Sequence, residues 1–67
     1  MTRDEWIAAF AADLGVDPPD ADTVETLLEL AGTAAHASER TAAPIACYLA
    51  GLARARPTDA AATAASI

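Results

Sequence analysis

Alanine is the feature that most limits how this chain can fold, because it fills 20 of the 67 positions while only three residues are aromatic. Alanine is the strongest helix former, and the aromatic residues that favour strands are few. We therefore predict an all-α fold, a compact bundle of three helices plus a short, weak C-terminal helix. Residues 1–56 are predicted to form a single helical domain, and residues 57–67 an alanine-rich tail or short helix.

Capping signals and prolines divide the chain into helices. Thr2 and Glu5 have the spacing of a capping box, in which each side chain bonds a free backbone N–H of the first turn, so a first helix begins there. Gly15 ends this helix, because glycine readily adopts the left-handed conformation of a C-terminal cap. Two consecutive prolines follow and cannot continue a helix.

The second and third helices are placed by the same signals. Asp22 and Glu25 repeat the capping-box spacing, and we predict a second helix from there to about residue 39. Gly32 lies within it and either weakens the helix or allows another helix to approach closely. Thr41 is the predicted N-cap of the third helix, and Thr58 that of the short fourth.

The third helix separates its residues by size. Its bulky face consists of Ile45, Tyr48, Leu49 and Leu52, and its small face includes Cys47, Ala50, Gly51 and Arg54. We expect the three aromatic residues, Trp6, Phe10 and Tyr48, to lie in the core. The small face is then either solvent-exposed or a surface on which another helix packs.

Composition and spacing exclude several classes of function. Ten acidic residues against four basic ones give a net charge of −6, so the chain lacks the basic surface that nucleic acids require. One cysteine and one histidine form neither a disulfide nor a closed zinc site. Ser38 and His36 point to different sides of a helix and cannot act as nucleophile and base. We therefore predict no enzyme activity, no metal and no cofactor.

The chain also lacks the signals of a secreted or membrane protein. Acidic residues occupy the start, where a signal peptide needs basic ones, and no apolar run approaches the roughly 20 residues that span a bilayer. We expect a cytoplasmic protein without membrane contact. Because so small a core only just offsets the entropy of ordering the chain, we also expect association with a protein partner or with a second copy.

One polar cluster is a candidate binding site. His36, Glu39 and Arg40 lie one turn apart on a helix, and Pro44 follows closely; we call these four residues the His36 corner. The imidazole can bond a carboxylate, and the guanidinium can grip a carboxylate or phosphate. Two interpretations remain open: the corner braces the bend after the second helix, or it binds a partner, with Trp6 as a further anchor.

Much of the chain resembles a small domain of unknown function from actinobacteria. The similar segments are Trp6–Val16, Leu27–Ala31 and Tyr48–Ala53, together with the string Ala-His-x-x-Glu-Arg-x-x-Ala-Pro that ends at Pro44. That domain occurs alone or attached to a molybdenum cofactor guanylyltransferase, near genes for molybdoenzymes and for the formate dehydrogenase accessory sulfurtransferase. The resemblance implies a context of molybdenum cofactor (molybdopterin guanine dinucleotide) assembly or insertion.

Two hypotheses of function follow. The first is a non-catalytic accessory module that docks, through the His36 corner, on a molybdenum cofactor enzyme such as formate dehydrogenase or on its maturation proteins. The alternative is a structural domain without ligand that forms a homodimer through the small face of the third helix. Binding of a pterin or nucleotide phosphate by Arg40 is less favoured, because a net charge of −6 repels anions.

Overall fold

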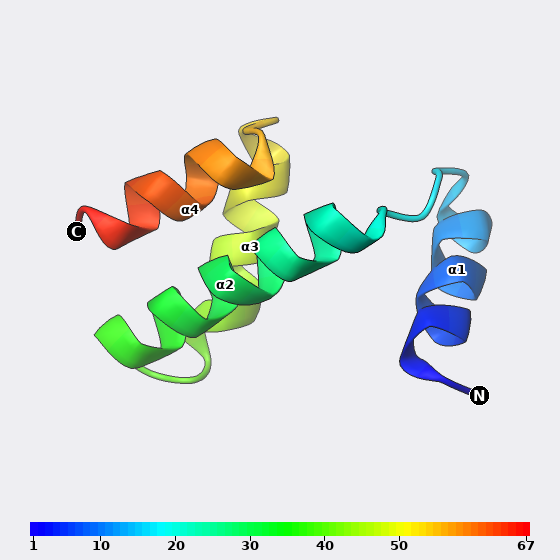
Figure 1. Cartoon of the computed structure of the whole chain (residues 1–67), viewed down its shortest axis with the longest axis horizontal. Helices are drawn as coiled ribbons and strands as arrows, with labels where there is room; N and C mark the ends of the chain where they lie inside the picture. Colours follow the sequence, from blue (N-terminus) through cyan, green and yellow to red (C-terminus); the bar gives the residue numbers. More distant parts are fainter.

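Four helices and no strand make up the structure, a computed structural model that describes all of residues 1–67 (Figure 1). The helices are α1 (Arg3–Leu14), α2 (Ala21–Ala37), α3 (Ala42–Leu52) and α4 (Pro57–Ala65). The two C-terminal helices each pack along α2, whereas α1 stands beyond the start of α2. The prediction of an all-α fold is confirmed. None of the four helices has both the length and the apolar character needed to cross a membrane.

Local capping fixes both ends of α1 as predicted. The Thr2 hydroxyl accepts a hydrogen bond from the Glu5 backbone N–H at 3.1 Å, and the Glu5 carboxylate accepts one from the Thr2 N–H at 2.8 Å. Gly15 ends the helix with a φ of 78°, a left-handed conformation that glycine adopts without steric cost. The capping box and the glycine cap are therefore confirmed.

The start and end of α2 differ from the prediction. Asp20, in extended backbone directly after the prolines, is the N-cap, and its carboxylate accepts a bond from the Thr23 N–H at 2.8 Å. The predicted cap at Asp22 is wrong, and this residue lies in the first turn, where its charge favours the helix dipole. The helix continues through Gly32 and ends at Ala37, two residues before the predicted end.

The caps of α3 and α4 use backbone geometry alone. Thr41 occupies the N-cap position of α3, as predicted, but makes no side-chain capping bond. In α4 the first helical residue is Pro57, and Arg56 is the N-cap, so the predicted cap at Thr58 is wrong. Proline suits that first position because its missing N–H needs no partner and its φ already fits a helix.

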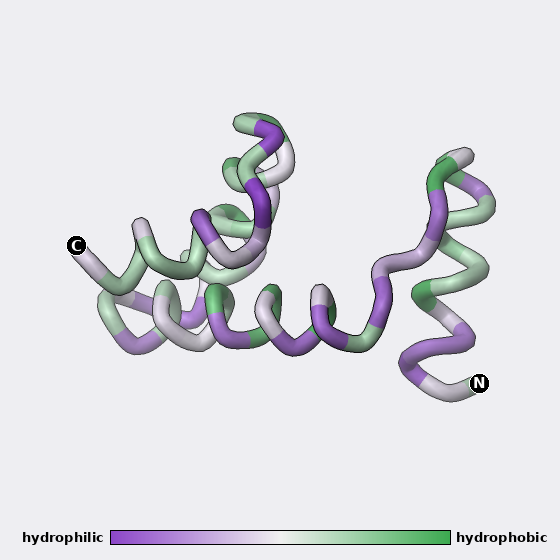
Figure 2. Tube along the Cα trace, turned by 45° about the horizontal axis from the view of Figure 1, so that its top comes forward, coloured by the Kyte–Doolittle hydropathy of each residue, from purple (hydrophilic) through white to green (hydrophobic).

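Alanines form most of the packed surface between the helices. The half-buried residues of α3 are small and share one stripe: Ala42, Ala43, Ala46, Cys47 and Ala50. Those of α4 include Ala60, Ala61 and Ala64. Along α2 the hydropathy alternates turn by turn, as expected for a helix with one packed side (Figure 2). Only Ala11 and Leu30 are buried.

The expectation that the aromatic residues form the core is wrong. Trp6, Phe10 and Tyr48 are 56%, 50% and 66% exposed. Trp6 and Phe10 lie on α1, which packs on no other helix as closely as α3 and α4 pack on α2. Tyr48 lies on α3, which contacts α2 through its small face, where alanine side chains permit a close approach. A helix that packs through this face turns its bulky face outward.

Candidate functional site

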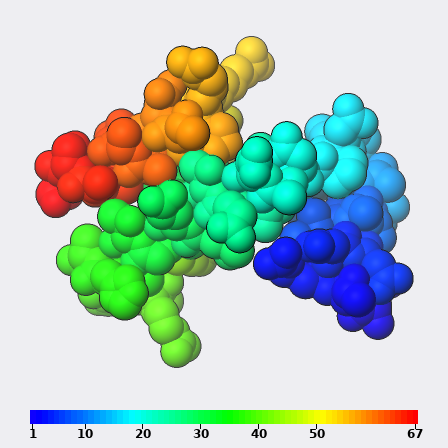
Figure 3. Space-filling model, in the orientation of Figure 1, coloured from blue at the N-terminus to red at the C-terminus, as the bar shows by residue number.

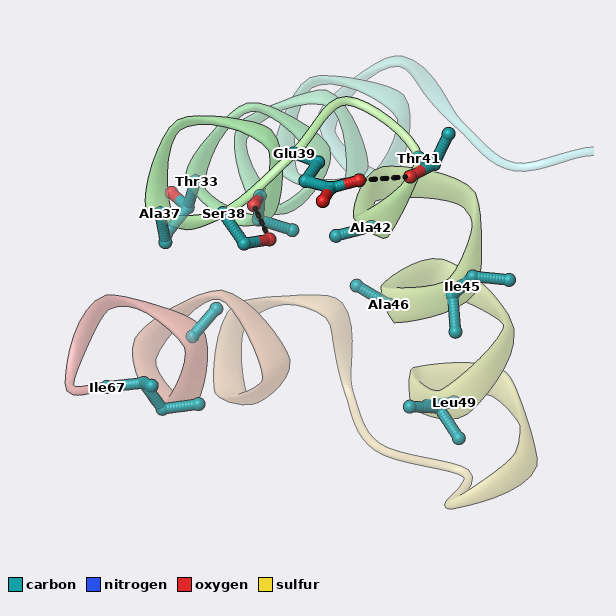
Figure 4. A pocket seen from close by; sticks show the side chains of 12 residues that line it. Thr33, Ala37, Ser38, Glu39, Thr41, Ala42, Ile45, Ala46, Leu49 and Ile67 are labelled. Carbon is teal, nitrogen blue, oxygen red and sulfur yellow. Dashed lines mark hydrogen bonds between the residues drawn. The ribbon is translucent and has the colours of Figure 1, made fainter.

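An apolar groove of about 620 Å³ opens between the end of α2, the first turns of α3 and the end of α4 (Figure 4). Alanines from all three helices form much of its lining. Ile67 lies across the groove from Ile45 and Leu49, which are the larger side chains that line it. The groove therefore offers an apolar surface with room for side chains of a partner.

The connection between α2 and α3 gives one side of the groove a polar rim. Ser38, Glu39 and Thr41 all line the groove. The Glu39 carboxylate accepts a hydrogen bond from the Thr41 hydroxyl at 3.3 Å, and the Ser38 hydroxyl donates to the Ala34 carbonyl at 3.2 Å. Apolar walls with a few polar groups are typical of sites that hold a ligand and fix its orientation.

The His36 corner adjoins this rim through Glu39. His36 lies in the last turn of α2, Glu39 and Arg40 in the connection, and Pro44 in the first turn of α3, and all four are exposed. Because α2 ends at Ala37, the predicted helical spacing of the three polar residues is wrong. Neither His36 nor Arg40 makes a side-chain hydrogen bond or ion pair, so the bonds that a brace requires are absent.

Trp6 does not join the corner. It lies on α1 and stacks on Phe10, with ring centroids 5.1 Å apart. The corner lies at the other end of α2, whose 17 residues span about 25 Å. The proposed partner-binding residues are therefore divided between two ends of the molecule.

The predicted self-association surface on α3 is also divided. Cys47 and Ala50 are half-buried in the stripe through which α3 packs, whereas Gly51 and Arg54 are exposed. Arg54 follows the helix with a φ of 55°, in the turn toward α4. These four residues do not form one free face, because the small side chains serve the contact with α2.

Two carboxyl groups, both outside the groove, have a lowered pKa. The two shifted groups are helix caps: the hydrogen bonds of the Thr2 backbone and side chain lower the pKa of Glu5, and those of the Thr23 side chain and backbone lower the pKa of Asp20. No three His, Cys, Asp or Glu side chains lie close enough together to hold a metal ion.

Comparison with known proteins places the chain in a family. The model of the family described as "Domain of unknown function (DUF6457)" matches residues 1–67, the whole chain. No curated protein and no solved structure matches it. The chain therefore belongs to the DUF6457 family of domains of unknown function.

Proposed function

We propose that this domain is a non-catalytic protein-binding module that serves a molybdenum cofactor enzyme, such as formate dehydrogenase, or its maturation proteins. The observation that carries the binding role is the apolar groove, whose polar rim includes Glu39 of the His36 corner. The molybdenum context is supported by the resemblance described for the string that ends at Pro44.

The arrangement suits recognition of a protein segment. The groove volume of about 620 Å³ falls within the roughly 300 to 1,000 Å³ of pockets that hold drug-sized groups, and several bulky side chains together have this size. The Arg40 side chain makes no hydrogen bond or ion pair within the chain, so its guanidinium is free to bind a carboxylate of a partner in a bidentate manner. The corner would then orient a segment whose apolar side chains fill the groove.

A second function, association with another copy of the chain, is favoured by a different observation. The bulky faces of α1 and α3 are exposed; the α1 face lies outside the groove, whereas the α3 face shares Ile45 and Leu49 with its lining.

Direct binding measurements test the accessory role. The purified chain is titrated by calorimetry against a molybdenum cofactor guanylyltransferase and, separately, a formate dehydrogenase of the same organism. Arg40→Ala and His36→Ala should each weaken binding about 10- to 150-fold, because hydrogen bonds to charged groups contribute about 1.5–3 kcal/mol.

The charge-matched control is Arg3→Ala, which removes a positive charge from the far end of the molecule and should leave the affinity unchanged. Wild-type affinity of Arg40→Ala, with unchanged helicity, contradicts a role of the corner. Absence of binding to either class of protein contradicts the molybdenum assignment.

A further inference from the structure

Two apolar faces have no partner within the chain. The α1 stripe comprises Trp6, Phe10 and Leu14, and the α3 outer face comprises Ile45, Tyr48, Leu49 and Leu52. All seven side chains are between 50% and 67% exposed. Contiguous exposed faces made of several large apolar side chains are typical of surfaces that bind another protein chain.

The exposed area shows how much surface the fold leaves uncovered. A compact monomer of 6.8 kDa exposes about 3,950 Å². This chain exposes 5217 Å², a surplus of about 1,300 Å² over that expectation. A standard interface buries about 800 Å² per partner, so two copies that covered the surplus would form an interface in the size range of permanent dimers. The radius of gyration of 12.2 Å likewise exceeds the roughly 11 Å expected for a compact chain of this length.

The chain's own α1 does not cover its own α3. Residues of α1, Ile7 among them, line a hollow together with Val24 and Leu28 from the first turns of α2. The two consecutive prolines between the helices hold α1 at this end of the molecule, beyond the start of α2 (Figure 3). The α3 outer face must therefore be covered from outside.

We propose that the occupant is a second copy, with the α1 stripe of each copy packed on the α3 outer face of the other. The two helices match in length, because 12 and 11 residues span about 18 and 16 Å. Each copy supplies both faces, so the contact occurs twice around a two-fold axis and the assembly closes as a dimer.

Charge complementarity favours this pairing over contact of like faces. The segment around α1 is acidic and carries Asp4, Glu5, Asp13 and Asp17. The segment after α3 carries Arg54 and Arg56; Arg56 is ion-paired with Asp59 at 3.2 Å, so Arg54 supplies the net positive charge. Reciprocal packing brings the acidic segment of one copy near the basic segment of the other, whereas pairing α1 with α1 opposes like charges.

Sedimentation velocity tests this dimer. Interfaces of this size have Kd values of micromolar or lower, so the wild type should be dimeric at about 100 µM. Its mass should then be twice the 6.8 kDa of one chain. Phe10→Arg and Leu52→Glu should each raise the Kd at least about 100-fold, because they place a charge in an apolar contact. Tyr48→Glu is a second variant of the α3 outer face with the same expected result. All three positions are exposed within one copy, so helicity by circular dichroism should be unchanged.

Mixing identifies the pairing. Phe10→Arg and Leu52→Glu, each monomeric alone, should form a dimer when combined, because one contact is then unaltered and the other pairs opposite charges. Arg40→Ala of the His36 corner, an exposed residue outside both faces, is the control and should remain dimeric. A monomeric wild type, a dimeric Phe10→Arg variant, or a mixture that stays monomeric overturns the proposal.

Discussion

Replacement of Leu30 by alanine should destabilise the chain more than any other leucine-to-alanine change. Leu30 is the only large side chain that is buried, at 3% exposure, and it lies on α2, against which α3 and α4 both pack. Removing a buried leucine side chain loses its transfer free energy and leaves a cavity, at a cost of about 2–5 kcal/mol. A domain of 67 residues has only about 3–10 kcal/mol of unfolding free energy in total.

The matched control is the same chemical change at Leu52, which is 67% exposed. At protein concentrations below the dimer Kd, Leu52→Ala should change the free energy of unfolding by no more than about 0.5 kcal/mol. Urea denaturation followed by circular dichroism measures both. Equal costs at the two positions would refute the conclusion that α3 packs through its small face and leaves Leu52 outside the core.

Acid should destabilise the chain partly through the α2 cap, because the pKa of Asp20 is lowered in the folded state. The stabilisation by this cap is complete when the pH is above the ordinary pKa of an aspartate. It is lost as the pH falls through the lowered pKa of the folded state. Asp20→Asn caps without titrating and should lose less Tm on acidification; equal losses contradict this. Gly32→Ala should add about 0.5–1 kcal/mol in urea denaturation, because a Cβ there meets no atom within 4 Å. Lower stability of this variant would show that Gly32 has a packing role.

Both ends of α1 can be predicted from the sequence because caps are local. Thr2, Glu5 and Gly15 act within a few residues of one another, and all three were identified correctly. Asp20 was missed because Asp22 offered the same cap with a more complete capping-box pattern. Which of the two aspartates becomes the cap depends on the residue at which the backbone becomes helical after the prolines.

The sequence does not show which face of α3 packs in the fold. Either face can pack against another helix, and the choice depends on the neighbouring helix. Hydrophobicity favoured the bulky face with Tyr48, whereas close approach favoured the face with Cys47. The groove cannot be predicted from the sequence for a related reason. It forms only when α4 packs on α2, because its lining residues come from distant parts of the chain, from Thr33 to Ile67. A useful signal was the run of alanines in the last eleven residues, which is suited to such close packing.

The dependence of thermal unfolding on protein concentration tests most directly whether two copies complete one hydrophobic core. Because unfolding then includes dissociation, each tenfold increase in concentration should stabilise each chain by about 0.7 kcal/mol and raise the Tm by about 3–6 °C. Phe10→Arg should abolish this dependence. A wild-type Tm that is independent of concentration, with a mass of one chain throughout, would contradict association through α1 and α3.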